Sequence, residues 1–200
     1  MTRDAAAFEQ LYRDNGDPWD YETSAYEADK YRRCLHLLPR ERYRNALEIG
    51  CSIGVMSAGI ALRCDHLLGI DFAPTAIDRA RRRGITNAAF EVGAVPEDWP
   101  GGTWDLIILS EVLYYLEPVA LERTIACVAR DLAADGDCLV VGYTGPTETR
   151  LSARQVSARL VDALTTARPK HRLYQCQGSS WIATVFSSRP DQSPAGGTDK

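Results

Sequence analysis

Hydrophobic and polar positions along this chain follow two alternating patterns. Short continuous apolar runs are typical of buried strands, and apolar residues spaced three or four apart are typical of helices. Five runs of the first kind lie in the middle of the chain: Ala46 to Gly50, Leu67 to Asp71, Ala88 to Val92, Trp104 to Ser110 and Asp137 to Tyr143. Helical patterns separate them, and strands that are apolar on both faces form parallel sheets covered on both sides. The pattern therefore predicts a doubly wound α/β fold.

Helices are expected between and after these strands. The four predicted between them cover Val55 to Arg63, Pro74 to Arg83, a short piece near Pro96 to Trp99, and Pro118 to Leu132, closed by the turn residues Asp135-Gly136. A further helix leads to two β-like runs, and these three segments cover Ser152 to Thr166, His171 to Cys176 and Ser180 to Ser187. Because the connection between the last two runs is of hairpin length, they predict an antiparallel pair at the edge of the sheet.

The first 40 residues predict two helices that precede the sheet. Phe8, Leu11 and Tyr12 have helical spacing, and a second helix is expected from Ser24, its N-cap, to Leu38. We expect this segment to form a helical lid on a single domain of residues 1–188. The tail, residues 189–200, is rich in Pro, Gly, Asp and Ser and is expected to be disordered.

Composition narrows the possible partners. A hydrophobic content of 45% over 200 residues is enough for one core, and a charged content of 25% with a net charge of -4 gives no basic stripe for nucleic acid. No apolar run approaches the roughly 18 residues of a membrane span, and none near the N-terminus resembles a signal peptide. The six cysteines and three histidines show no metal-binding spacing. We expect a cytoplasmic protein without metal, nucleic acid or membrane partners.

The turn after the first predicted strand is the first candidate for ligand binding. It reads Glu48-Ile49-Gly50-Cys51-Ser52-Ile53-Gly54 and enters a helix, where small residues let a ligand lie against backbone N–H groups. Such a turn alone is weak evidence for ligand binding, because glycine also occurs where the backbone needs a positive φ angle or where a helix packs closely.

An acidic residue at the end of the second predicted strand strengthens this interpretation. Asp71 lies 17 residues after Gly54, an offset at which a carboxylate can accept hydrogen bonds from both ribose hydroxyls. The alternative is that Asp71 only caps the next helix. Phe72 follows and offers an apolar platform for adenine.

With these residues in place, the stretch from Leu47 to Tyr143 resembles the class I S-adenosylmethionine (SAM) dependent methyltransferases. The resemblance implies a Rossmann-like, mostly parallel seven-stranded sheet whose last strand is antiparallel. Asp17-Pro18-Trp19, Tyr26-Glu27 and Lys30-Tyr31 resemble the nodulation protein S (NodS) branch, as does the turn after the first strand. This branch implies N-methylation of the free amino group of a deacetylated chitooligosaccharide, with SAM as the cofactor and S-adenosylhomocysteine (SAH) as the product.

The resemblance also implies a set of cofactor-binding residues. These are Trp19, Glu48, Gly50, Cys51, Ser52, Gly54, Asp71, Phe72, Ala94, Val95 and Ser110. Ser52 replaces the middle glycine of the broader family, which is tolerable because SAM has no pyrophosphate. After the third strand the family commonly has an acidic residue for adenine, but this chain has Gly93-Ala94-Val95. Adenine would have to be recognised there by the backbone, or by Glu97 or Asp98.

The end of the fourth predicted strand supplies the candidate catalytic residues, Glu111, Tyr114 and Tyr115. Open α/β sheets bind ligands at this edge. Methyl transfer to an amine needs alignment and exclusion of water rather than a protein nucleophile, but an acceptor ammonium must lose a proton. Glu111 can take that proton or hold the amine, with the tyrosines as hydrogen-bond partners. The alternative is that Glu111 caps the following turn. Trp19, Tyr21 and Tyr26 are candidates for the lid.

Other functions remain open at this point. A nicotinamide-dependent oxidoreductase shares the glycine turn and the acidic residue, but Ser52 and the terminal hairpin do not fit it. A methyltransferase of nucleic-acid bases or protein glutamine would show Asn/Asp-Pro-Pro-Tyr, where this chain has Ser110-Glu111-Val112-Leu113. A small-molecule natural-product N- or O-methyltransferase and a non-catalytic SAM-binding protein are further alternatives. We expect a small-molecule acceptor and a monomer or weak dimer.

Overall fold

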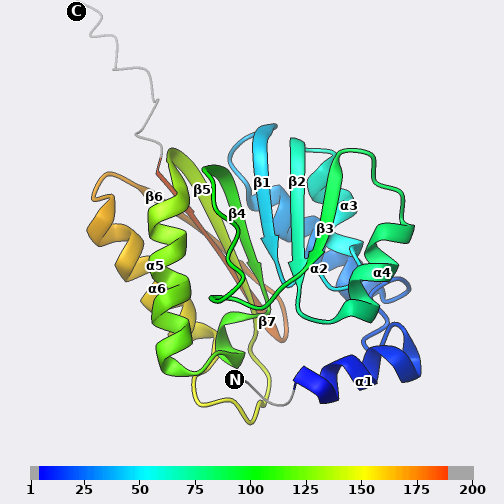
Figure 1. The fold of residues 1–200 in the computed structure, drawn as a ribbon. Coiled ribbons are helices and arrows are strands. Elements are labelled where there is room, and N and C mark those ends of the chain that lie inside the picture. The colour runs from blue at the N-terminus through cyan, green and yellow to red at the C-terminus, as the bar shows by residue number, and fades with distance from the viewer. Residues whose placement is uncertain (1–4, 189–200) are drawn as a thin grey trace, which may run out of the picture.

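A computed structural model describes residues 5–188, which form one seven-stranded sheet with helices on both faces (Figure 1). The strand order is β3-β2-β1-β4-β5-β7-β6. The strands are β1 (Tyr43–Ile49), β2 (Cys64–Asp71), β3 (Ala88–Val92), β4 (Trp104–Ser110), β5 (Leu132–Tyr143), β6 (Arg172–Gln177) and β7 (Trp181–Ser187). The first five strands are parallel, and β7 is antiparallel to both β5 and β6. This confirms the predicted fold and the terminal antiparallel hairpin.

Two hydrophobic clusters, one on each face, hold the helices against the sheet. The helices are α1 (Ala5–Asn15), α2 (Ala25–Leu37), α3 (Val55–Ala61), α4 (Pro74–Arg82), α5 (Pro118–Asp131) and α6 (Ala153–Ala167), with a short 3-10 helix η1 (Leu113–Tyr115). Side chains of β4 alternate between the faces: Ile107 and Leu109 pack with α5 and α6, whereas Leu106 and Ile108 pack with α2 and α3. In Figure 1, α5 and α6 lie in front of the sheet, and α2 and α3 lie behind it.

A predicted turn and a predicted helix are absent, and β1 and β2 each begin three residues before the predicted start. Asp135-Gly136 does not form a turn after α5, because β5 begins at Leu132, immediately after that helix. Leu132 pairs with Trp104, and the register then shifts before Asp137 pairs with Leu106, so the turn-type residues lie within an irregular part of the strand. The segment near Pro96–Trp99 forms a turn rather than a helix.

The N-terminal helices pack beside the carboxyl ends of the parallel strands. Ser24 caps α2, since its side chain accepts a hydrogen bond from the Glu27 N–H at 3.3 Å. From α1, Glu9 accepts hydrogen bonds from Thr75 at the start of α4, with the hydroxyl at 2.6 Å. Both predicted helices are therefore present, and α1 reaches across to α4 (Figure 1).

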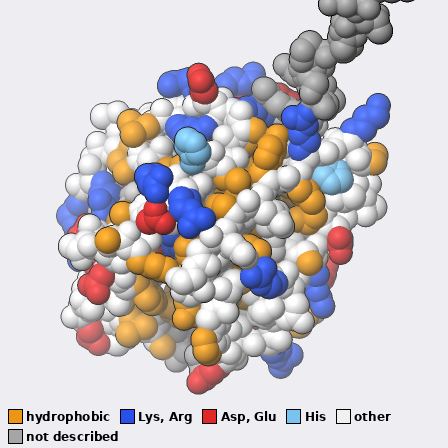
Figure 2. All heavy atoms as spheres, turned by 180° about the vertical axis from the view of Figure 1, so that it is seen from behind, with side chains coloured by type: hydrophobic (Ala, Val, Ile, Leu, Met, Phe, Trp, Pro, Cys, Tyr) orange, Lys and Arg blue, Asp and Glu red, His pale blue; other side chains and the backbone are white. Residues whose placement is uncertain are grey.

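The surface agrees with the composition. On the face seen from behind, basic side chains are dispersed among hydrophobic and uncharged ones rather than gathered in a stripe (Figure 2). Among residues 5–188, no helix has both the length and the apolar character that a membrane span needs. The predicted disordered tail, residues 189–200, lies outside the described residues.

Candidate active site

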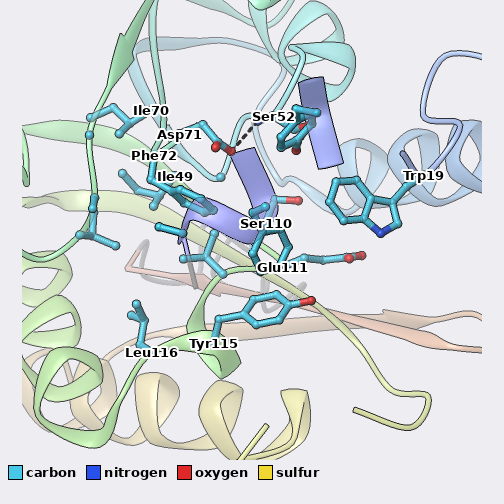
Figure 3. Close-up of a pocket in the computed structure, with 18 of the residues that line it drawn as sticks. Trp19, Ile49, Ser52, Ile70, Asp71, Phe72, Ser110, Glu111, Tyr115 and Leu116 are labelled. Atoms are coloured by element: carbon cyan, nitrogen blue, oxygen red, sulfur yellow. Dashed lines mark hydrogen bonds between the residues drawn. The ribbon is translucent and has the colours of Figure 1, made fainter. Parts of the chain in front are cut away.

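A cavity of about 190 Å³ opens where the parallel strands end. The ends of β1, β2 and β4 and the segment after β3 line it from the sheet, and α1 with the loop before α2 covers it (Figure 3). The predicted residues that line it are Trp19, Gly50, Ser52, Asp71, Phe72, Ala94, Val95, Ser110, Glu111 and Tyr115. Because the parallel strands end at one edge of the sheet, residues that are far apart along the chain meet in this cavity.

The turn after β1 is pressed against the turn after β4. A Cβ on Gly50 would lie 2.3 Å from the Val112 side chain and 2.7 Å from the Ser110 carbonyl, so only glycine fits there. Gly50 and Gly54 also have positive φ angles, 81° and 77°. Gly54 starts α3 and lines neither cavity, so its role is in the backbone. Close packing at Gly50 places the turn after β1 directly beside Glu111.

Asp71 binds backbone N–H groups and retains acceptor capacity. One carboxylate oxygen accepts a hydrogen bond from the Ser52 N–H and the other from the Ala73 N–H, both at 3.0 Å. A carboxylate has about four lone-pair sites, so acceptor capacity remains for a ligand. Burial raises the pKa of Asp71 to about 6. The bond to Ala73 shows that capping and ligand binding are compatible at this residue.

Glu48 and Cys51 line a second cavity, of about 20 Å³, which shares Gly50, Ser52 and Glu111 with the first. The Ser57 hydroxyl donates to Glu48 at 2.5 Å, and burial raises the pKa of Glu48 to about 8. Two buried carboxyl groups, Glu48 and Asp71, thus flank the glycine turn.

The adenine end is formed by aromatic and backbone groups. Phe72 is 37% exposed and lies edge-on to Phe8 of α1, with ring centroids 5.7 Å apart. The two acidic candidates are engaged elsewhere: Asp98 accepts from the Ala94 N–H at 3.0 Å, and Glu97 binds Arg123 at 2.8 Å. Neither lines the cavity.

Glu111 stands at the end of β4 in an unusual backbone conformation. Its φ is 56°, a left-handed value uncommon for a residue with a side chain, and its N–H donates to the Val141 carbonyl at 2.9 Å. Its carboxylate binds Lys30 of α2 at 2.6 Å. Val112, at the N-cap of η1, has no capping side chain, and the bond of the Glu111 carboxylate goes to Lys30 instead.

The two tyrosines after Glu111 differ in position. Tyr115 lines the cavity, with its ring 5.4 Å from that of Phe8. Tyr114 is only 4% exposed, packs in the core with α6 and lines neither cavity. Because burial also raises its pKa well above the usual value, Tyr114 is a core residue. The expectation that it contacts the acceptor is wrong.

The cover of the cavity contains residues that the sequence indicated and residues that it did not. Trp19 and Tyr21 line the cavity as expected, whereas Tyr26 is outside it and shares a hydrogen bond of 3.0 Å with Ser180. Phe8 and Tyr12 also line it, although their helical spacing indicated only an apolar helix face. Tyr12 shares a hydrogen bond of 2.6 Å with the Ser52 hydroxyl. Lys30 entered the sequence analysis only as part of the resemblance to the NodS branch, and nothing there indicated that it pairs with Glu111.

These groups fit the chemistry of SAM. The Asp71 carboxylate suits ribose hydroxyls, the Phe72 ring suits adenine, and the buried carboxyl of Glu48 offers a hydrogen-bonding group to the amino-acid end. Within residues 5–188, no three His, Cys, Asp or Glu side chains are gathered as a metal site requires. The arrangement can hold a nucleoside and place its reactive end near Glu111.

Comparisons with known proteins identify the family of the chain. The sequence profile of the family Nodulation protein S (NodS) matches residues 5–177. Nodulation protein S from Sinorhizobium fredii is 33% identical over 178 residues, covering 86% of this chain and 82% of that relative. Nodulation protein S from Bradyrhizobium diazoefficiens is 32% identical over 147 residues, covering 66% and 70%.

A solved structure shows the same fold with a ligand bound. The N-methyltransferase NodS from Bradyrhizobium japonicum WM9, in complex with SAH, superimposes with a TM-score of 0.74 over 90% of this chain and 96% of that one, at 24% identity. The family match, the relatives and the geometry of the site point the same way. This chain belongs to the NodS family of SAM-dependent methyltransferases.

Proposed function

We propose that this enzyme methylates a free amino group on a small molecule, and that its acceptor is a deacetylated chitooligosaccharide in Nod factor synthesis. Membership of the NodS family supports the substrate class. The observation that carries the chemistry is the Glu111 carboxylate, which lines both cavities beside the glycine turn. An amine is the acceptor class that a carboxylate at this position serves directly.

The reaction needs a neutral nitrogen in line with the donor methyl group. SAM supplies a methyl group on a sulfonium; a nitrogen–carbon bond forms, the carbon–sulfur bond breaks, and the sulfur leaves as the thioether of SAH. The amine must give up one proton, and Glu111 is placed to accept it or to hold the amine by a hydrogen bond. The protein otherwise aligns the two reactants.

The aromatic cover keeps water away from this step. Phe8 contacts Phe72 on one side and Tyr115 on the other, and Trp19 contacts Phe8 at 6.0 Å between ring centroids. We infer that this N-terminal cover acts as a lid over the donor. The rings of Trp19 and Tyr21 also line the cavity, and aromatic faces suit the apolar faces of sugar rings.

Labelled SAM with a panel of acceptors tests this function. The panel contains partially deacetylated chitooligosaccharides, fully acetylated ones as the matched control, and unrelated small amines. We expect a mass gain of one methyl group on the deacetylated sugars alone, with more than one turnover per enzyme. Product only on the other amines would favour a natural-product methyltransferase, and SAM binding without product would favour a non-catalytic protein.

Two further expectations remain predictions. A monomer or weak dimer should be seen by light scattering of the purified protein over a range of concentrations. A cytoplasmic location should be seen by fractionation of the source cells.

A further inference from the structure

Lys30 links the helix that precedes the sheet to the candidate catalytic carboxylate. Its ammonium lies 2.7 Å from a Glu27 oxygen on the same helix, α2, and 2.6 Å from Glu111 Oε1 after β4. Lys30 is only 3% exposed and lines neither cavity. It can therefore affect an acceptor only through the side chains that it contacts, and of these Glu111 lines both cavities.

The surroundings keep Lys30 charged. Burial by itself would lower the pKa of Lys30, but Glu111 and Glu27 outweigh it and the pKa is raised. The rings of Tyr31 and Tyr26 lie 5.2 Å and 5.8 Å from the ammonium, within reach of a cation–π interaction. A buried ammonium between two carboxylates is a fixed positive charge at neutral pH.

The other titratable groups that face this pair are neutral. Burial raises the pKa values of the Tyr21, Tyr31 and Tyr114 hydroxyls well above the usual value. The remaining facing groups, the Cys34 thiol and the Glu48 carboxyl, have pKa values raised by burial to about 12 and about 8. Within residues 5–188, Lys30 is thus the cation that forms an ion pair with Glu111.

The two oxygens of Glu111 have different roles. Oε1 accepts from Lys30, whereas Oε2 accepts no hydrogen bond from the described part of the chain. Figure 3 shows the carboxylate directed between the Trp19 ring and the Tyr115 hydroxyl. One oxygen is fixed by α2 and one is presented to the cavity.

We propose that Lys30 is a positioning residue of the methyl-transfer reaction, which fixes Glu111 Oε1 so that Oε2 alone meets the acceptor amine. This rests on the proposed function. Glu27, Lys30 and Glu111 together carry one net negative charge, which a single acceptor ammonium neutralises. The ion pair holds one oxygen of Glu111 on α2 and leaves the other for the amine. The same charge favours amines over neutral hydroxyl groups.

The test compares Lys30→Met with Lys30→Arg and with Arg32→Met. Arg32 is on the same helix, but its side chain is 72% exposed and pairs with Asp29, so its loss removes one charge from α2 without touching Glu111. For Lys30→Met we expect kcat/KM at neutral pH to fall by about tenfold to a hundredfold. The acidic limb of its pH profile should move to higher pH by about one unit. Lys30→Arg should restore most of the activity, and Arg32→Met should match the wild type.

Glu27→Gln should shift the acidic limb of the pH profile in the opposite direction to Lys30→Met. This separates a positioning role of Lys30 from a purely structural one. With Glu27 neutral, the ammonium acts on Glu111 alone, so the acidic limb should move to lower pH. A purely structural ion pair would lower the Tm of both variants and leave the limb in place. If Lys30→Met does not fold, Lys30→Arg and Glu27→Gln carry the test.

The outcomes distinguish the two proposals. SAM affinity should stay within about threefold of the wild type in every folded variant. An acidic limb that coincides with the wild type in Lys30→Met, or that moves the same way in Glu27→Gln, overturns the role of Lys30 and leaves the amine methyltransferase intact. A wild-type enzyme that binds SAM but methylates no amine overturns both.

Discussion

The donor end and the acceptor end of the cavity are built in different ways. At the donor end, the contacts join residues close along the chain: Ser52 to Asp71, 19 residues apart, and Glu48 to Ser57, 9 apart. At the acceptor end, Lys30 and Glu111 are 81 residues apart. The carboxylates of the donor end are therefore placed by two strand ends, with α1 added through Tyr12 and Phe8, whereas the ion pair of the acceptor end forms only when α2 is docked on the sheet.

This difference predicts separable defects. Changes at the donor end should weaken SAM, and changes at the acceptor end should slow the reaction while SAM still binds. A variant that weakens SAM binding and slows turnover to the same extent would show that the donor and acceptor ends are not separable.

Glu111→Gln should give the largest effect. Glutamine keeps the size of the side chain but cannot take a proton, so turnover with an amine acceptor should fall about a hundredfold or more. SAM affinity, measured by calorimetry, should change by less than about threefold. Turnover equal to the wild type at every pH would remove Glu111 from the reaction.

Asp71→Ala should weaken SAM by about 1–3 kcal/mol, because it removes charged acceptors for the ribose hydroxyls. Calorimetric titration measures the change. Asp78→Ala is the matched control, since its side chain on α4 is 62% exposed and lies outside the cavity. If the two variants bind SAM equally well, the ribose role is wrong.

The pH dependence of SAM binding gives a second test of the ribose-binding role of Asp71. Since burial raises the pKa of Asp71 to about 6, the carboxylate takes up a proton as the pH falls through 6 and loses charge and acceptor capacity. SAM affinity should fall by about fivefold between pH 6 and pH 5, because the ionised fraction of Asp71 falls from about one half to about one tenth over that range. Asp71→Asn should bind more weakly but lose this dependence. A flat wild-type curve over this range would contradict the assignment.

Tyr12→Phe should give the smallest effect. It removes the hydroxyl that bonds Ser52, and SAM should weaken by about 0.5–1.5 kcal/mol. Tyr26→Phe is the control, because it removes a hydroxyl from the same N-terminal segment but breaks a bond to Ser180 outside the cavity. A larger loss of SAM affinity in the control would mean that the segment acts only through its docking.

The same contrast explains what could be predicted from the sequence. The strands in the centre of the sheet were predictable because continuous apolar runs have few other uses, and Asp71 and Glu111 were found because strand ends meet at one edge. The start of β5 was missed because pairing with Trp104, which no local pattern reveals, overrides the turn preference of Asp135-Gly136.

The site was likewise predictable only where local sequence patterns determine the position of a side chain. Tyr114 and Tyr115 are adjacent and chemically identical, but one faces the core and the other the cavity, which only the geometry of η1 decides. Phe8 and Tyr12 read as an apolar helix face because the cavity is itself apolar there. Lys30 could not be found, since an ammonium gives no sign of a carboxylate 81 residues away.

The insertion of β7 between β5 and β6 has a consequence for the order in which the enzyme becomes active. On the ribosome, the strands that grip the donor emerge early, but β6 has no neighbour until the last strand follows it. Tyr26 and Arg33 of α2 bond to Ser180 and Gln177 around that final hairpin. A nascent chain can therefore form its nucleoside-binding strand ends first, and the contacts that hold α2 at the acceptor end form only after β7 has been made.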